Sequence, residues 1–168
     1  AFKGGTLRNT LIVENEAPDA AGVSGYYGGV LENCTVADNW AELRGGGIYF
    51  YQGGVVRNSI IYYNTALYGA NYYTEIYGDD HFEYSCTIPL ASGLGNLSTP
   101  PAFAAALGSY FIMAESSSRN AGQALPWHDG SADLEGDARV LETAVDIGAD
   151  EYLDSDGDRL PDRWEWSY

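Results

Sequence analysis

The chain has little positive charge. Lysine and arginine together number 8, against 24 acidic residues, and the formal net charge is −16. Nucleic-acid binding depends on clustered lysine and arginine that displace counterions, and anionic membrane surfaces attract basic segments. We therefore expect neither nucleic acid nor a charged membrane surface as a partner.

Cysteines and long apolar runs are also scarce. The two cysteines, Cys34 and Cys86, cannot form a disulfide framework. No stretch is long and apolar enough to insert into a membrane, and no secretory leader is visible. The chain begins inside a repeat, so we expect a piece of a longer protein whose targeting signal lies elsewhere.

Glycine and tyrosine are plentiful, with 21 and 14 copies, and they favour turns and sheets. Three segments repeat one pattern: a glycine, two hydrophobic residues, a charged residue, an asparagine, a small residue, more hydrophobic residues and a closing asparagine. These segments are Gly5–Asn15, Gly29–Asn39 and Gly54–Asn64, and a weaker copy includes Tyr84–Ile88.

The repeat predicts the fold. Apolar runs such as Thr10–Val13 and Ser59–Tyr63 are too short for a helical repeat, and the regular leucines of a leucine-rich repeat are missing. We therefore expect an all-β protein, a right-handed single-stranded parallel β-helix of about 3–4 coils stacked at about 4.8 Å. It should be a monomer.

We divide the chain into three regions. Residues 1–88 form the coils, residues 89–152 form an irregular C-terminal cap, and residues 153–168 form an acidic loop. A stack of coils exposes its last core layer and needs a cover. The residues expected to cover this open end are Phe103, Phe111, Ile112, Leu125 and Ile147.

The repeated asparagines predict two structural ladders, because asparagine tolerates the left-handed backbone of sharp turns and stacked amides hydrogen-bond to one another. The alternative is a set of unrelated loop asparagines. The first ladder comprises Asn9, Asn33 and Asn58, and the second comprises Asn15, Asn39 and Asn64.

Two further columns follow from the same alignment. Arg8, Glu32 and Arg57 alternate in charge and should form ion pairs between coils. Thr10, Cys34, Ser59 and Cys86 should share a column, which places the cysteines two coils apart, too far for a disulfide. Both are expected to be buried, free thiols.

The strongest chemical motif lies between Asp154 and Glu165. Its acids occupy positions 1, 3, 5, 9 and 12 of a twelve-residue loop, the ligand spacing of an EF-hand. Position 6, which needs glycine in that motif, is Arg159. The alternative is a solvated acidic tail. The predicted calcium ligands are Asp154, Asp156, Asp158, the Leu160 carbonyl, Asp162 and Glu165.

Other acids are less regular. A second metal ion is a weaker alternative for the group Asp133, Glu135, Asp137, Asp146, Asp150 and Glu151. One compact acid/base cluster comprises Asp79, Asp80, His81 and Glu83. Glycoside hydrolysis needs two carboxyl groups held a defined distance apart, and nothing in a loop of adjacent acids fixes that distance. We therefore predict no catalytic residue.

Nine of the fourteen tyrosines fall between Tyr49 and Tyr84. Outward-facing aromatic rings on a flat sheet can stack against sugars. The candidates for glycan binding are Tyr51, Tyr63 and Tyr73. The alternative is that the tyrosines only cover the sheet.

Five runs in order carry a family resemblance: NSIIYYNTA, GLGNLSTPPAF, LGSYFIMAESSSRNAG, DLEGDARV and VDIGADEY. They resemble the choice-of-anchor Q domain, a C-terminal module of bacterial right-handed parallel β-helix proteins. STPPAF and RNAG depart from its usual phrases. The resemblance implies extracellular display with sorting signals further along the chain, and no agreed enzymatic activity.

Two functions remain open. The first is a non-catalytic extracellular or cell-surface module, structural, adhesive or glycan-binding, with calcium stiffening its C-terminal junction. The second is the C-terminal part of a polysaccharide lyase or glycoside hydrolase whose catalytic coils lie upstream. An upstream cleft lined by aspartate, arginine and lysine would favour the enzyme.

Overall fold

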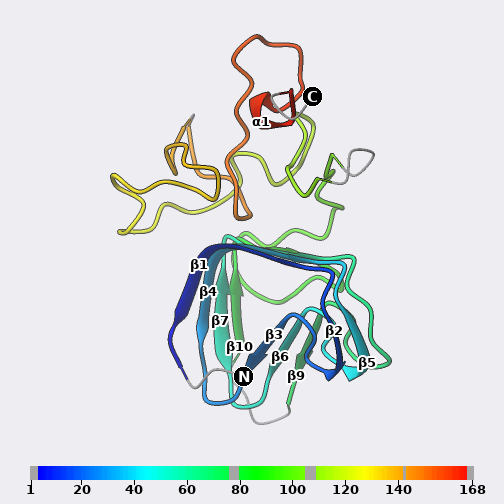
Figure 1. Ribbon diagram of the computed structural model, residues 1–168. Helices are drawn as coiled ribbons and strands as arrows, with labels where there is room; N and C mark the ends of the chain where they lie inside the picture. The colour runs from blue at the N-terminus through cyan, green and yellow to red at the C-terminus, as the bar shows by residue number, and fades with distance from the viewer. Residues whose placement is uncertain (1–3, 76–79, 105–108, 142, 166–168) are drawn as a thin grey trace.

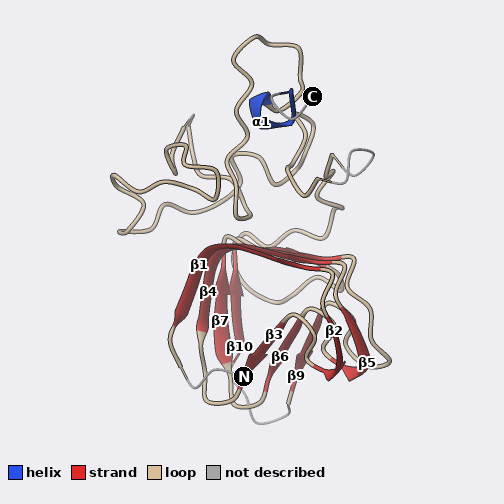
Figure 2. Cartoon of the chain, viewed as in Figure 1, coloured by secondary structure: helices blue, strands red, loops and turns tan. Residues whose placement is uncertain are grey.

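The computed structural model describes residues 4–75, 80–104, 109–141 and 143–165, with only the backbone of Asp80, Arg163 and Trp164. Apart from one short helical turn, its regular elements are strands (Figure 2). They are β1 (Thr6–Val13), β2 (Glu16–Asp19), β3 (Val23–Gly25), β4 (Val30–Ala37), β5 (Trp40–Arg44), β6 (Ile48–Phe50), β7 (Gly54–Arg57), β8 (Ile60–Tyr62), β9 (Tyr72–Thr74), β10 (Asp80–Glu83), β11 (Cys86–Thr87) and α1 (Asp162–Glu165).

The strands stack in parallel into three walls. One wall contains β1, β4, β7, β8, β10 and β11, a second contains β2 and β5, and a third contains β3, β6 and β9. Each strand pairs with its equivalent in the next turn, as Leu7 pairs with Leu31 and Leu31 with Val56. The chain is therefore a parallel β-solenoid of about three turns, which confirms the expected fold.

The largest wall bends sharply once in each turn. Asn9, Asn33 and Asn58 occupy this bend with φ of 45°, 50° and 48°, and Tyr84 continues the column with φ of 47°. Asparagine adopts this left-handed backbone more readily than most residues. At another corner glycine is required, because a Cβ on Gly22 would lie 2.4 Å from the next turn's carbonyl oxygen.

The interior of the solenoid is narrow and apolar. Alternate residues of each strand point inward, as the strand period of two requires. This cluster includes Leu31, Val36, Ile48, Phe50, Val56 and Ile61, all fully buried. A second apolar cluster lies on the opposite side of the largest wall, where Ile60 packs with Ile112, Ile147 and Tyr152.

This second cluster corrects the expected position of the cap. Ile112, Ile147 and half-buried Phe103 pack on the outer side of β8, not over the end of the stack. The last turn is instead covered by the segment that follows β11: Ala91 joins the interior cluster, and the Asn96 amide donates to the Phe82 carbonyl at 2.8 Å.

The C-terminal part of the chain lies along one side of the solenoid. Figure 1 shows it, in yellow to red, beside the bend of β1 and β4. We call residues 118–141 and 143–152 the docked segment. It is almost entirely loop, so its position depends on what it contacts in the solenoid.

The two cysteines lie on opposite sides of the largest wall. Cys34 belongs to the interior cluster and Cys86 to the outer cluster, and both are buried, free thiols. The expected column is thus wrong at its last member: Ser85, not Cys86, stacks on Ser59, whose backbone N–H donates to the Ser85 hydroxyl at 3.3 Å.

Over the described ranges, no helix has the length and apolar character needed to cross a membrane.

Candidate metal centre and its junction with the solenoid

Three predicted calcium ligands converge in the acidic loop. One carboxylate oxygen from each of Asp154, Asp156 and Asp158 lies within 4.8 Å of the others. Like charges at this spacing repel one another. Hard oxygen donors gathered in this way match the preference of calcium, so the residues present fit that ion.

Backbone and side-chain donors hold Asp154 in place. Its carboxylate accepts from the backbone N–H of Gly157 at 2.7 Å, from that of Arg159 at 3.0 Å and from the Tyr152 hydroxyl at 3.0 Å. The pKa of Asp154 is lowered from its usual value: slight desolvation opposes the change, and these hydrogen bonds outweigh it. The carboxylate therefore remains ionised down to low pH.

The loop has its sharp turn at the expected place. Arg159, at position 6, has a φ of 77°, and Gly157 has a φ of 81°. The backbone at position 6 is thus left-handed although the residue is not glycine. Such a conformation costs an ordinary residue on the order of 1 kcal/mol.

The remaining predicted ligands are arranged differently. The Asp162 carboxylate accepts from the backbone N–H of Ser155 at 2.6 Å and from its hydroxyl group, so it ties the end of the loop to its start. Slight desolvation and the four loop aspartates raise the pKa of Glu165 in α1. The Leu160 backbone N–H donates to Asp158 at 2.7 Å. Asp162 and Glu165 are outside the group of three convergent carboxylates.

Tyr152 connects the loop to the solenoid. Its hydroxyl donates to Asp154, and its ring belongs to the outer apolar cluster with Ile60 of β8. The Arg119 guanidinium lies over the same ring, 4.5 Å from its centre. Tyr152 therefore links the acidic loop directly to the interface between the docked segment and the solenoid.

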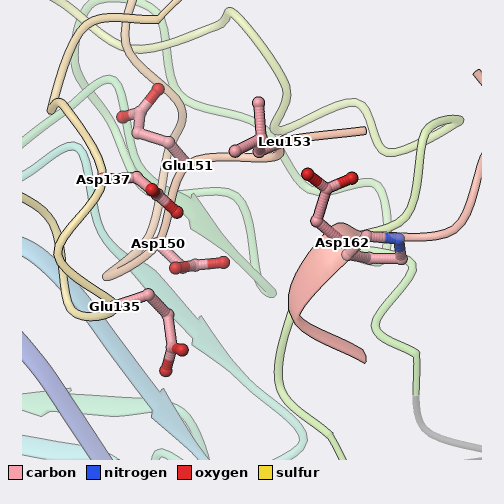
Figure 3. A pocket seen from close by; sticks show the side chains of 7 residues that line it. Glu135, Asp137, Asp150, Glu151, Leu153 and Asp162 are labelled. Carbon is pink, nitrogen blue, oxygen red and sulfur yellow. The ribbon is translucent and has the colours of Figure 1, made fainter. Parts of the chain in front are cut away.

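A cavity lined by carboxylates lies beside the loop. Figure 3 shows Glu135, Asp137, Asp150, Glu151 and Asp162 around it, and its volume of about 50 Å³ has room for water. Burial, helped by nearby Asp133 and Glu135, raises the pKa of Asp150 to about 9. Asp150 therefore keeps its proton at neutral pH.

One buried cation balances this group. Arg139 is fully buried and contacts Glu151 at 2.6 Å, and that carboxylate is also buried. The guanidinium also donates to the carbonyls of Asp146, Gly148 and Ala149 at 2.9–3.2 Å. Arginine stays charged under all ordinary conditions, and it favours the ionised form of Glu151, although burial raises the pKa of that carboxyl group. The sequence did not predict this role for Arg139. The chain has seven arginines, and their positions in the sequence do not indicate which one is buried.

The Asn15 column forms a ladder of side-chain amides. The Asn15 amide donates to Asn39 at 2.8 Å, Asn39 donates to Asn64 at 2.9 Å, and Asn64 donates to Asn71 at 3.2 Å. Asn39, Asn64 and Asn71 are buried. Asn71 extends the ladder from outside the repeat pattern, which is why the sequence did not predict it. We call this set the inner column.

The Asn9 column has a different role, and we call Asn9, Asn33 and Asn58 the outer column. One hydrogen bond links its members, from Asn58 to Asn33 at 3.3 Å. The other contacts go to the docked segment. Asn58 donates to the Gln123 carbonyl at 2.7 Å and accepts from its N–H at 2.8 Å, and Asn9 donates to the Ala132 carbonyl at 2.5 Å.

Further contacts complete this junction. The Gly148 N–H donates to the Asn58 carbonyl at 2.8 Å, and the Ala149 N–H donates to the Thr35 hydroxyl at 3.1 Å. The buried ring of His128 contacts the Asn33 side chain at 3.0 Å. A chain without regular structure must satisfy its backbone polar groups elsewhere, and here the side chains and turns of the solenoid provide the partners.

The three candidate tyrosines lie at separate places. Tyr51 is stacked on Tyr26, with ring centres 4.7 Å apart. Tyr63 packs edge-on against Tyr62. Tyr73 packs edge-on against its neighbour in the preceding turn, Tyr49. They therefore do not form one strip.

The charged column runs further than expected. Arg8 contacts Glu32 at 2.8 Å, Glu32 contacts Arg57 at 3.6 Å, and Arg57 contacts Glu83 at 3.0 Å. The predicted ion pairs are confirmed, and Glu83 of the former acid/base cluster belongs to them. In that cluster His81 is exposed, and Asp79 lies outside the described residues.

A second charged column joins Asp19, Arg44 and Glu75. Arg44 contacts Asp19 at 3.1 Å and Glu75 at 3.5 Å. The sequence did not indicate it because the residues fall outside the aligned asparagine segments.

Comparison with protein-family models, with curated proteins and with solved structures gave no match for this chain.

Proposed function

We propose that this chain is a non-catalytic module of an extracellular or cell-surface β-solenoid protein, and that calcium bound in its acidic loop stabilises the junction between the docked segment and the solenoid. The observation that carries the proposal is the convergence of Asp154, Asp156 and Asp158 within a turn whose backbone is already left-handed at position 6.

Electrostatics favour this reading. Three convergent carboxylates repel one another, two of them exposed and that of Asp154 half-buried, and hydrogen bonds keep Asp154 ionised. A divalent cation would remove the repulsion and lower the pKa of Glu165, which slight desolvation and the loop aspartates now raise. Asp162 and Glu165, the first and last residues of α1, are the groups that would move to complete the ligand set.

The link to the solenoid explains what the ion would do. Tyr152 contacts Asp154 by its hydroxyl and packs by its ring against the outer side of β8. Fixing Asp154 would therefore restrict Tyr152, and the ion's binding energy would favour the docked arrangement. A ligand that binds only the folded state stabilises it in proportion to the logarithm of its concentration.

The affinity should suit an extracellular setting. Arg159 places a positive charge at position 6, which disfavours a bound cation. Dissociation constants of about 10⁻⁴–10⁻³ M are typical of extracellular calcium modules. Calcium at about 10 mM should then add about 1.5–3 kcal/mol of stability, which corresponds to a rise in Tm of roughly 3–10 °C.

The test compares melting of the chain in calcium, in magnesium at equal ionic strength, and in EDTA. Calcium should raise the Tm and magnesium should not. The double variant Asp156→Asn with Asp158→Asn should abolish the rise. The matched control, Glu42→Gln with Asp129→Asn, removes the same charge from exposed sites outside the loop and should keep it.

Arg159→Gly gives a second, opposite test. It removes the positive charge beside the site, so calcium should bind several-fold more tightly by calorimetric titration. Arg159→Lys keeps the charge and should behave like the wild type. If calcium raises the Tm of the wild type and of the D156N/D158N variant equally, or raises neither, the loop is not the site.

A further inference from the structure

His128 lies at the centre of the junction between the docked segment and the outer column. Its side chain is buried, and Trp127 packs against its ring with centres 4.4 Å apart. The Trp127 ring itself lies under the Arg8 guanidinium of β1, at 4.8 Å. The ring of His128 is thus enclosed by residues from the solenoid and from the docked segment.

Its hydrogen bonds fix one neutral tautomer. The backbone N–H of Leu125 donates to Nδ1 at 3.1 Å, so Nδ1 carries a lone pair. The proton therefore sits on Nε2, which donates to the Asn33 Oδ1 at 3.0 Å. That same oxygen accepts from the Asn58 amide. A single imidazole joins the docked segment to two members of the outer column.

A second proton has no place in this arrangement. It would have to sit on Nδ1, facing the Leu125 N–H, and two donors would then oppose each other. The imidazolium would also be buried near Arg139 and Arg8, with Glu32 as the opposing charge. Burial first, then Arg139 and Arg8, lower the pKa of His128 to about 4, although Glu32 opposes them.

We propose that His128 is an acid-sensitive latch: when its ring gains a proton, the docked segment is released from the outer asparagine column while the solenoid stays folded. The solenoid does not depend on this histidine, because its turns are joined by backbone ladders and by the inner column. This inference does not require calcium, and it can be tested in EDTA.

The direction of the pH effect follows from the two states of the ring. Once released and solvated, His128 regains its ordinary pKa near 6.5, whereas in the docked state the pKa is about 4. The released state therefore binds the proton more tightly. The contribution of His128 to docking is complete above about pH 6.5, and for this group alone the ratio of docked to released molecules falls roughly tenfold per pH unit between these two values.

The test is amide hydrogen exchange of the full chain between pH 7 and pH 4 in EDTA, corrected for the intrinsic rate. The amides of Gln123, Gly148 and Ala149 report docking, since their partners are in the solenoid. The amides of Ala41 and Ile48 report the solenoid. In the wild type, protection of the first set should fall about a hundredfold, and that of the second should not change.

Two variants distinguish the pH effect of His128 from that of nearby carboxyl groups such as Asp146. In His128→Asn the amide oxygen can accept from Leu125 but cannot titrate, so the loss of protection at low pH should disappear. His81→Asn makes the same change at an exposed site and should keep it. A wild-type slope in H128N, or no slope in the wild type, would overturn the proposal.

Should H128N fail to fold, His128→Gln is the second variant, because its amide can still donate to Asn33. The ring of wild-type His128 can also be titrated directly by NMR. A midpoint near 6.5 with the docking amides still protected would equally overturn the latch.

Discussion

Apart from Asn71, the two asparagine columns run along the same wall of the solenoid and arise from the same repeat, yet their side chains have different partners. In the inner column each amide bonds to the next asparagine, so it holds one turn on another. In the outer column most bonds go to the docked segment. Asparagines that recur at the same spacing therefore stabilise the solenoid in one column and an interface in the other. The difference depends on which hydrogen-bond partners lie within reach of each column.

The largest effect should come from Arg139, which sits where the outer column meets the buried acids. Arg139→Met leaves Glu151 without its partner in a buried site, and we expect a loss of about 3–5 kcal/mol in the free energy of unfolding at pH 8. Burial raises the folded pKa of Glu151, so lowering the pH to 5 protonates it and recovers part of the loss.

Urea unfolding of the wild type and of Arg139→Met at pH 8 and pH 5 measures this loss in the free energy of unfolding. The control is Arg44→Met, which removes a half-exposed pair on another wall and should cost about 1 kcal/mol or less. Equal losses in the two variants would show that Arg139 has no special role in the junction.

The inner column should rank next. Asn39→Ala removes donors to the Ile12 and Ala37 carbonyls and to Asn64. Several buried groups lose their partners, and the expected cost is about 2–4 kcal/mol. Asn15→Ala, at the exposed end of the same ladder, should cost less than about 1 kcal/mol. Equilibrium denaturation compares them, and a cost for N15A as large as that for N39A would contradict the ladder's dependence on burial.

The outer column should give a smaller and more local effect. Asn58→Gly keeps the left-handed backbone without strain but loses both side-chain bonds to Gln123. We expect a cost of about 1–2 kcal/mol, mainly in docking. Tryptic cleavage after Arg139, followed by mass spectrometry, should accelerate, while cleavage after Arg44 and Arg57 stays slow. Acceleration at all three sites would mean that Asn58 supports the whole solenoid.

The charged column should matter least. Glu32 is largely buried, but its partners Arg8 and Arg57 are about 46% and 35% exposed, so water screens the pairs. Glu32→Gln should cost about 1 kcal/mol or less, and 0.5 M NaCl should reduce the difference from the wild type. A loss above about 3 kcal/mol that salt does not change would show that packing, not charge, is at work.

The period of the asparagines predicted the stacked turns and their register, because strands that repeat must pair with their equivalents. The spacing of Asp154, Asp156 and Asp158 predicted that they converge. The sequence could not place the docked segment: Ile112 and Ile147 are apolar whether they cover an end or a side, and only the folded chain brings them to Ile60. The contacts of His128, which the sequence placed only as a residue of the cap, and of Arg139 could not be predicted for the same reason, since their partners lie about a hundred residues away or on irregular backbone.

Native-state hydrogen exchange of the wild type in increasing urea at pH 7 tests the central claim most directly. The account predicts two classes of amide. Those of Gln123, Gly148 and Ala149 should exchange through a partial opening that costs less free energy than global unfolding, whereas those of Ala41 and Ile48 should need the global transition. A single opening free energy shared by both sets would contradict the account, because the outer column would then be part of one cooperative unit with the inner one.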